Sequence, residues 1–222
     1  MPPGRNVATD RPVRRVLLVY PPTTMFTQGE RKRVVFPIGI GYLAAALERA
    51  GFEVGILDAT LADYAREEAV AEGAVRFGMS LEAIRDAIAA RAPDAVGVGV
   101  FSSTQAENGH AVCRLAKEVD AGIRTVMGGA YPTAETQACL ADPHVDFAVV
   151  GEGERALVDL LRAPERFPDA VVAADAPIQD LDALPLPARH LVDFPAYSQV
   201  PDYVLTRRRP YAGLFSSRGG PF

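Results

Sequence analysis

The sequence contains no tryptophan, little cysteine and histidine, no excess of positive charge and no long apolar run. Its 222 residues include two cysteines and three histidines, and the formal net charge is −5. Such a chain offers no overall positive field to a phosphate backbone, which argues against nucleic acid as a partner. Its apolar runs are far shorter than the roughly 20 residues of a membrane-spanning helix, so no membrane partner is expected.

The start of the chain lacks a targeting signal. Residues 1–13 contain arginines, but no apolar segment of signal-peptide length follows them. We therefore expect residues 1–13 to be a disordered leader and the protein to be cytoplasmic.

The two cysteines are not arranged as a metal centre. Cys113 and Cys139 fall in predicted helices and lack the Cys-x-x-Cys spacing of metal and redox sites. Both are expected to be buried apolar thiols. The chain therefore offers no iron–sulfur cluster site on its own cysteines.

Short apolar runs alternate with amphipathic stretches along residues 14–163. Continuous Val- and Ile-rich runs are typical of strands that are covered on both faces. The five predicted strands are residues 15–20, 53–58, 95–101, 124–128 and 146–151. Repeated strand–helix units predict an α/β fold with a doubly wound, Rossmann-like or flavodoxin-like five-stranded parallel sheet.

The predicted helices carry recognisable ends. Residues 40–51 form an apolar stripe that stops at Gly51, and residues 80–93 begin with Ser80 as N-cap and stop at Pro93. Further helices are expected within residues 106–122, 133–142 and 152–162. Prolines crowd residues 164–200, which predicts an extended linker, and residues 201–222 look like the opening of another sheet.

In an open parallel sheet a ligand binds beyond the carboxyl ends of the strands. Here those positions are rich in glycine, which lets a flat ligand approach the backbone, and in hydroxyl groups, which can bond to amides. For any single one of them an ordinary turn or cap role is the simpler interpretation. The candidate cofactor-binding residues are Thr23, Ser102, Ser103, Thr104, Gly128, Gly129, Tyr131, Pro132, Thr133, Gly151, Glu152, Gly153 and Glu154.

Glu152 and Glu154 stand near the start of a predicted helix. Carboxylates are favoured there by the helix dipole, so capping alone explains them. They would also repel a phosphate, which predicts that any ligand group at this loop is a hydroxyl or an amide.

A second motif suggests a different function. Gly39, Gly41 and Ala44 match the G-x-G-x-x-A dinucleotide fingerprint, and Asp58 follows at a suitable distance for a ribose. The fingerprint should turn directly off the first strand, whereas here a long loop intervenes. That loop carries three consecutive basic residues, 31–33, which could contact a phosphate or a partner domain or could simply be solvated.

Taken together, the motifs resemble one family. VLLVYPP, FPIGIGYLAAALERAGFEVGILDA, AVGVGVFSST, VMGGAYPT, DFAVVGEGE and LDALPLPAR follow one another as in the N-terminal half of the cobalamin-binding radical SAM enzymes. The resemblance implies a cobalamin (B12)-binding module of a methyltransferase-like enzyme, followed by a radical SAM partial barrel. In full-length relatives S-adenosylmethionine and a 4Fe-4S cluster are expected as well, with the radical SAM domain acting in cis or in trans.

The last residues resemble the start of that barrel. In the family a loop similar to S-x-R-G-C-P-F supplies the first cluster cysteine, and residues 216–222 fit it except that Gly220 takes the place of the cysteine. The resemblance therefore implies that this chain alone is not catalytic.

The resemblance also bears on the cobalt. The chain has no D-x-H-x-x-G motif, and His110, His144 and His190 are expected to be ordinary surface or packing residues. Cobalamin is therefore expected to be base-off and without a histidine ligand, with residues near Thr23 to Phe26 as one candidate to face the cobalt. The other interpretations that stay open are a nicotinamide-dependent oxidoreductase domain and a non-catalytic carrier or interaction domain.

Overall fold

A computed structural model describes residues 11–28, 31–173, 176–200 and 213–214. Most of the expected leader, residues 1–10, lies outside the described residues. So do the expected barrel segment 201–222, apart from residues 213–214, and with it Gly220.

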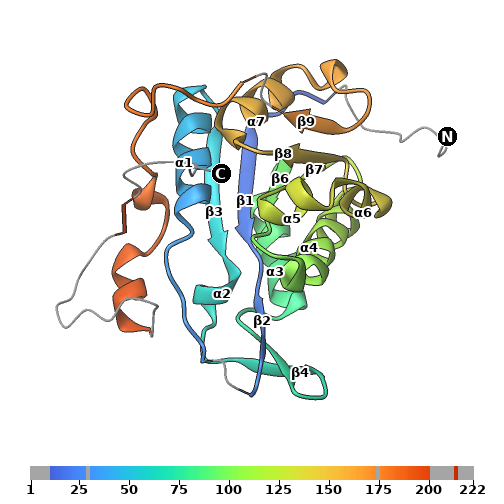
Figure 1. Ribbon diagram of the computed structural model, residues 1–222. Coiled ribbons are helices and arrows are strands. Elements are labelled where there is room, and N and C mark those ends of the chain that lie inside the picture. The colour runs from blue at the N-terminus through green and yellow to red at the C-terminus, as the bar shows by residue number, and fades with distance from the viewer. Residues whose placement is uncertain (1–10, 29–30, 174–175, 201–212, 215–222) are drawn as a thin grey trace.

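The centre of the molecule is a parallel sheet, as the sequence predicts (Figure 1). Its strands are β1 (Arg15–Tyr20), β3 (Glu53–Asp58), β6 (Ala95–Gly99), β7 (Arg124–Gly128), β8 (Phe147–Val150) and β9 (Val171–Ala173). The order β3-β1-β6-β7-β8-β9 is the flavodoxin-like order. After β3 is added on one side of β1, the later strands are added on the other side, beginning with β6. The sheet has six strands instead of the expected five, because β9 lies within the stretch expected to be linker and is too short to produce a pattern of its own.

Helices cover both faces of this sheet. Helices α1 (Ile38–Arg49) and α7 (Gly153–Arg162) pack together on one face, and α3 (Leu81–Arg91) and α4 (Ala106–Val119) pack together on the other. The shorter helices are α2 (Ala59–Ala62), α5 (Ala130–Ala134) and α6 (Thr136–Ala141). Short 3-10 turns occupy Ser103–Gln105, Pro164–Arg166, Arg189–Leu191 and Phe194–Gln199.

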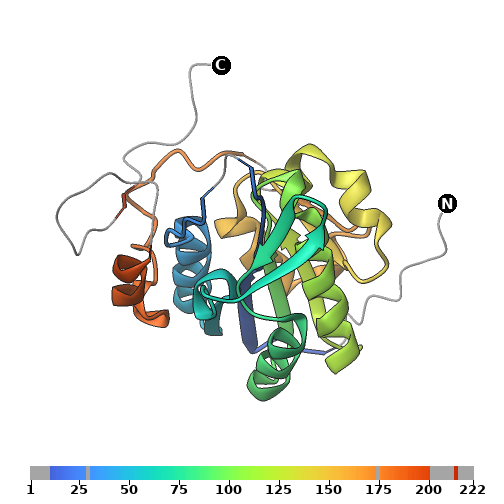
Figure 2. The same ribbon diagram turned by 90° about the horizontal axis from the view of Figure 1, so that it is seen from below.

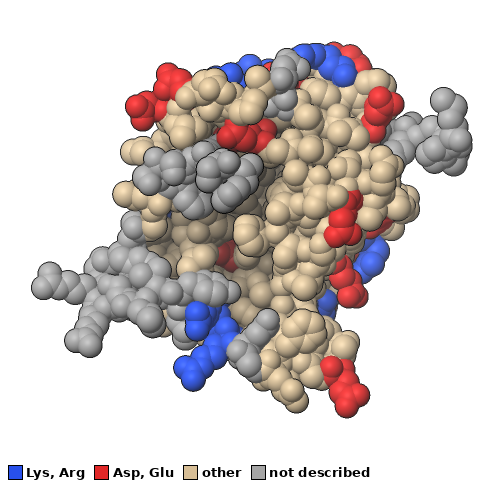
Figure 3. Space-filling model, in the orientation of Figure 1, with Lys and Arg blue, Asp and Glu red and all other residues tan. Residues whose placement is uncertain are grey.

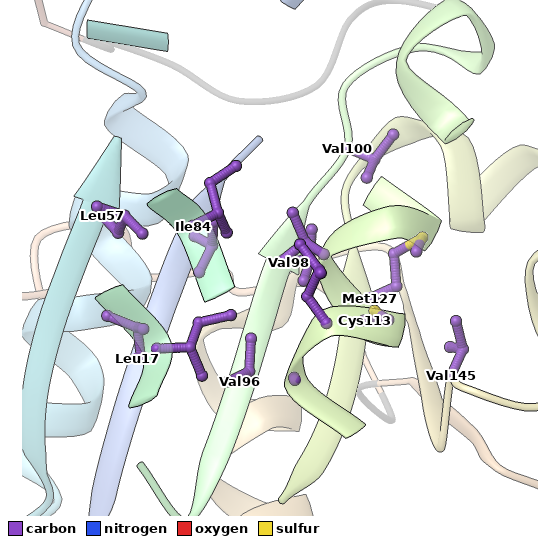
Figure 4. Close-up of a cluster of buried hydrophobic side chains, with 14 of the residues drawn as sticks. Leu17, Leu57, Ile84, Val96, Val98, Val100, Cys113, Met127 and Val145 are labelled. Carbon is purple, nitrogen blue, oxygen red and sulfur yellow. The ribbon is translucent and has the colours of Figure 1, made fainter. Parts of the chain in front are cut away.

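The two faces explain the uninterrupted apolar pattern of the strands. Along β1, Leu17 and Val19 point into one buried cluster, and Val16 and Leu18 point into the other. The first cluster lies against α3 and α4 and includes Cys113 and Cys139, which are buried as expected (Figure 4). Burial raises the pKa of the Cys113 thiol, so this sulfur is an apolar packing atom rather than a thiolate.

A second, smaller sheet was not anticipated. Strands β2 (Thr23–Phe26), β5 (Ala74–Phe77) and β4 (Glu67–Ala71) pair antiparallel in that order. In Figure 2 this sheet lies across the end of the large sheet at which β1 and β3 finish. The sequences of β4 and β5 mix charged and apolar residues over only a few positions, so the strands are too short to show a clear hydrophobic period.

The expected helix ends are present. The Ser80 hydroxyl accepts a hydrogen bond from the Ala83 N–H, and α3 stops before Pro93, with Ala92 in the left-handed region at φ 42°. None of the helices in the described part of the chain has the length and apolarity needed to cross a bilayer.

Residues 176–200, here called the strap, run along the outside of α1. The Arg49 guanidinium donates to the Ala183 carbonyl near one end of α1, and the Ala188 N–H donates to the Gly41 carbonyl near the other. The strap then reaches the end of β3, where the Tyr197 hydroxyl donates to Asp58 Oδ2 at 2.7 Å. It is therefore attached along its length and is not a free linker.

The Tyr197–Asp58 contact is buried and titratable. Asp58 Oδ1 accepts from the N–H groups of Thr60 and Leu61, so both carboxylate oxygens are bonded. Burial raises the pKa of Asp58 above its usual value, and the hydrogen bond from Tyr197 acts in the opposite direction. Protonated Asp58 is thus favoured by folding, and this favourable contribution to stability is lost as the pH rises through the raised pKa.

Tyr197→Phe removes the hydroxyl that supports the ionised carboxylate. We expect the free energy of unfolding at pH 7 to fall by about 1–3 kcal/mol, because the buried Asp58 carboxyl group loses a hydrogen-bond donor. The loss should shrink as the pH is lowered and a larger fraction of Asp58 is protonated. Urea denaturation at several pH values measures this, with Tyr64→Phe as control, since the Tyr64 hydroxyl makes only a 3.5 Å contact to the Lys32 carbonyl. Equal losses for Tyr197→Phe at pH 7 and pH 4.5 would contradict the prediction.

Candidate functional site

The loop after β6 places an aromatic ring in the open. Phe101 is 77% exposed, although it follows the buried residue Val100. The hydroxyls of Ser102 and Thr104 bond to each other at 2.8 Å, and the Ser103 hydroxyl donates to the Glu135 carboxylate. The loop is therefore anchored by its own polar groups and leaves an apolar surface above β6.

The loop after β7 is shaped by one glycine. Gly129 has φ 111°, and a Cβ atom there would lie 2.4 Å from the Val100 carbonyl oxygen, so only glycine fits. The Thr133 hydroxyl donates to the Gly129 carbonyl at 2.8 Å and accepts from the Gly151 N–H at 3.1 Å. Thr133 thereby joins the loops after β7 and β8.

The same loops leave bare backbone at the surface. Gly129 and Gly151 are exposed, and a Cβ atom on Gly151 would meet nothing within 4 Å. We call the surface formed by Phe101, Ser102, Gly129, Thr133 and Gly151 the shelf. Figure 3 shows that the middle of the face seen in Figure 1 consists almost entirely of uncharged residues.

The residues after Gly151 turn inward. The Glu152 carboxylate accepts from the Ile178 N–H of the strap, and Glu154 is buried at 6% exposure. A Cβ atom on Gly153 would lie 2.9 Å from Leu43 Cδ2, so this glycine allows α7 to approach α1. These three predicted site residues are held by contacts within the protein.

Tyr131 and Pro132 are also buried, while Gly128 is partly exposed at the end of β7. The Tyr131 hydroxyl bonds to His110 Nε2, and His110 Nδ1 bonds to Asp142, which also pairs with His144. Burial acts to raise the pKa of Asp142, but hydrogen bonds from His144 and the neighbouring histidines hold it below its usual value. Tyr131 therefore belongs to a polar chain beneath the surface rather than to the shelf.

Thr23, on β2, is also held by contacts within the protein. Its hydroxyl bonds to that of the buried Thr60 at 3.0 Å, and Thr60 donates to the Pro21 carbonyl. The adjacent backbone of Thr24 exchanges two hydrogen bonds with the Gln105 side chain.

Asn108 adds a second contact between β2 and the start of α4. The sequence analysis did not identify Asn108. It is 3% exposed, and its amide donates to the Pro22 carbonyl and to the Thr24 hydroxyl. Asn108 precedes the buried residues Val112 and Leu115 by four and seven positions, so it lies in the apolar stripe of α4. A polar residue in an apolar stripe requires partners, and this was the available signal.

Together, Gln105 and Asn108 fasten β2 above the carboxyl ends of β1 and β6, where the strand order of the sheet reverses. This point is where open α/β sheets commonly bind ligands. Here it is taken by the chain itself, and the exposed backbone lies further along the edge, above β6, β7 and β8.

The dinucleotide fingerprint does not form a phosphate loop. Gly39, Gly41 and Ala44 lie inside α1, and a Cβ atom on Gly41 would lie 2.7 Å from the Phe36 ring. Both oxygens of Asp58 are bonded within the protein, so this carboxylate is not available to a ribose. Gly41 serves the packing of α1 against Phe36 and the strap, whereas Gly39 faces open space, and the nicotinamide interpretation of this loop is not favoured.

The basic loop is partly used by the fold. Lys32 Nζ pairs with Glu67 at 2.9 Å, donates to the Tyr64 carbonyl and lies 4.7 Å from the centre of the Tyr64 ring. Among the described residues no group of three or more His, Cys, Asp or Glu side chains could hold a metal ion.

The fold is that of a flavodoxin-like α/β domain, with bare backbone and hydroxyls exposed at the carboxyl edge of its sheet. The chain belongs to the B12-binding domain family, whose model ("B12 binding domain") matches residues 28–161. It is a cobalamin-binding module, as the resemblance implied.

Curated relatives carry methyltransferase and cyclase names. Cytidylyl-2-hydroxyethylphosphonate methyltransferase of Streptomyces wedmorensis is 37% identical over 146 residues, 65% of this chain and 27% of the relative. An uncharacterized methyltransferase of Pyrococcus horikoshii is 28% identical over 230 residues, 95% of this chain and 44% of the relative. Anaerobic magnesium-protoporphyrin IX monomethyl ester cyclase of Synechocystis is 28% identical over 159 residues, 70% of this chain and 28% of the relative. The chain thus spans less than half the length of each of these relatives.

Gly129→Ala tests the close approach of the loops beneath the shelf. We expect the free energy of unfolding to fall by about 1–3 kcal/mol, because alanine disfavours the positive φ and meets the Val100 carbonyl. Gly39→Ala is the matched control: it has helical geometry and open space, so stability should stay the same or rise by up to about 1 kcal/mol. Urea denaturation measures both, and similar values for the two variants would refute this account of Gly129.

Proposed function

We propose that cobalamin lies flat on the shelf. The ring of Phe101 is apolar, exposed and next to backbone without side chains, which suits the face of a large flat macrocycle. The hydroxyls of Ser102, Ser103, Thr104 and Thr133 bond within the protein, but a hydroxyl oxygen has two lone pairs and can also accept from the amide N–H groups of the corrin periphery. The observation that carries the proposal is the exposed strip from Phe101 to Gly151 within a B12-binding domain.

The histidines support a cofactor held without an imidazole ligand. His110 is bonded through both ring nitrogens, to Asp142 and Tyr131. His144 precedes β8, and His190 pairs with Glu48 near the end of α1, so both belong to the opposite edge of the sheet. The proposed state is therefore base-off, with no histidine on the cobalt. The predicted contacts of Tyr131, Pro132, Glu152, Gly153 and Glu154 would then be indirect, through the backbone that they position.

Bound cobalamin would itself carry a methyl group. By the resemblance of its sequence motifs, we propose that the chain is the cobalamin-binding part of a radical SAM methyltransferase-like enzyme. Residues 14–163 would carry the cofactor, residues 164–200 the connection, and residues 201–222 the start of the radical SAM domain. The names of its relatives from Streptomyces wedmorensis and Pyrococcus horikoshii agree with methyl transfer. S-adenosylmethionine and the 4Fe-4S cluster would belong to the radical SAM domain, in cis or in trans, and the present chain would not catalyse alone.

Cobalamin binding can be measured by visible absorbance after mixing with hydroxocobalamin and desalting. We expect the wild-type chain to retain the corrin with a base-off spectrum. Phe101→Ala should weaken retention by roughly tenfold or more, because the contact area of a phenyl ring is lost. Leu186→Ala is the matched control, since Leu186 is another apolar side chain that is 79% exposed, is not one of the shelf residues, and should bind as wild type.

Two results would count against the proposal. A colourless wild-type protein after desalting would favour a carrier or interaction domain without a ligand. Retention that is equal in Phe101→Ala and wild type would place the corrin elsewhere. A base-on spectrum would refute the base-off assignment alone.

A further inference from the structure

A pair of arginines lies on one face of the small sheet, outside the shelf. Arg76 is opposite Glu68 in the β4–β5 register, and side chains opposite each other in an antiparallel pair share a face. Arg66 precedes β4, and its guanidinium donates to the Glu68 carboxylate. The three side chains form a cluster, here called the hairpin cluster.

The hairpin cluster has more donors than its acceptor can use. Arg66 Nη2 and Arg76 Nη2 both bond to the same oxygen, Glu68 Oε2, at 2.8 and 3.1 Å. Arg66 Nη1 and Arg76 Nε are buried and have no hydrogen-bond partner. The Arg76 side chain is only 11% exposed. Buried guanidinium N–H groups without acceptors are costly, which indicates that an additional acceptor belongs here.

The hairpin cluster faces the ligand-binding edge. Thr24 of β2 lies opposite Arg76, and its side chain, on the same face, accepts from Asn108 at the start of α4. The face with Arg66 and Arg76 is therefore turned towards the loop after β6, which carries Ser102 and Thr104. The opposite face of β5 carries Phe77, which is buried against Val34 and Tyr197.

The charges nearby do not neutralise the excess. Glu68 balances one of the two arginines, and Glu67 is already paired with Lys32 on the other face. The net charge of the hairpin cluster is thus positive, although the chain as a whole is acidic.

We propose that Arg66 and Arg76 form a binding site for a phosphate group of a ligand held at the carboxyl edge. Two forked guanidinium groups can donate to several oxygens of one phosphate, and charge-assisted bonds of this kind are strong. The phosphate could belong to the nucleotide tail of cobalamin or to a separate phosphorylated molecule. The first source rests on the proposed function, and the second does not.

The test compares wild type with the double variant Arg66→Gln/Arg76→Gln. Arg85→Gln/Arg91→Gln is the matched control, because it removes the same charge from α3, where Arg85 pairs with the adjacent Asp86 and Arg91 bonds to the Ala87 carbonyl. One arm measures the thermal unfolding midpoint in inorganic phosphate and in sodium chloride of equal ionic strength. The other arm measures, by equilibrium dialysis, the affinities for hydroxocobalamin and for cobinamide, a corrin without the nucleotide phosphate.

If the phosphate is that of the cofactor, wild type binds cobalamin roughly tenfold or more tightly than cobinamide. Arg66→Gln/Arg76→Gln then loses this preference while its cobinamide affinity is unchanged. If the phosphate belongs to another molecule, the preference is the same in both proteins, and inorganic phosphate raises the unfolding midpoint of wild type and of the control variant but not that of Arg66→Gln/Arg76→Gln.

Glu68→Gln provides an independent check should the double variant fold poorly. Removing the competing carboxylate should strengthen phosphate binding while it leaves both arginines in place. The proposal is overturned if phosphate has no specific effect on wild type or on Glu68→Gln and if the ratio of cobalamin to cobinamide affinity is the same in all variants. Failure of wild type to bind either cobalamin or cobinamide would refute the proposed function instead, and the phosphate arm would still decide this inference.

Discussion

The structure depends on burying both faces of one parallel sheet. Neighbouring residues of β1 enter different apolar clusters, so all four residues in the middle of the strand are committed to packing. A strand of this kind has no side chain left for chemistry. The polar and ligand-binding groups must therefore come from the loops at the strand ends. The position of the shelf, above the carboxyl ends of β6, β7 and β8, follows from this constraint.

One part of that edge is covered by the chain itself, and another part is left exposed as the shelf. Gln105 and Asn108 hold β2 over the divergence of β1 and β6, while Thr133 holds the loops after β7 and β8 together. The first contact closes one part of the edge, and the second keeps bare backbone open in the other. Small side chains beneath the open part matter more than reactive ones, because a large flat cofactor is recognised chiefly by area and by peripheral hydrogen bonds.

Much of this arrangement could be predicted from the sequence. Continuous apolar runs gave five of the strands, Ser80 and Pro93 marked a helix, and glycine-rich strand ends indicated the edge. The rest depended on contacts between distant residues. Nothing local in Thr24 or Gln105 indicates that they pair, and β9 is too short to have a period. Gly41 fits a dinucleotide fingerprint although it is small because α1 packs closely against Phe36. A local pattern reports which residues are small or apolar, but not what approaches them.

The strap has a consequence for what counts as one folding unit. Its residues supply the backbone N–H that binds Glu152, the chain segment against α1 and the hydroxyl that binds Asp58, and the strand just before it completes the sheet. A fragment cut at residue 163 would uncover the β8 edge and the outer surface of α1. Cooperative unfolding should therefore extend through residue 200.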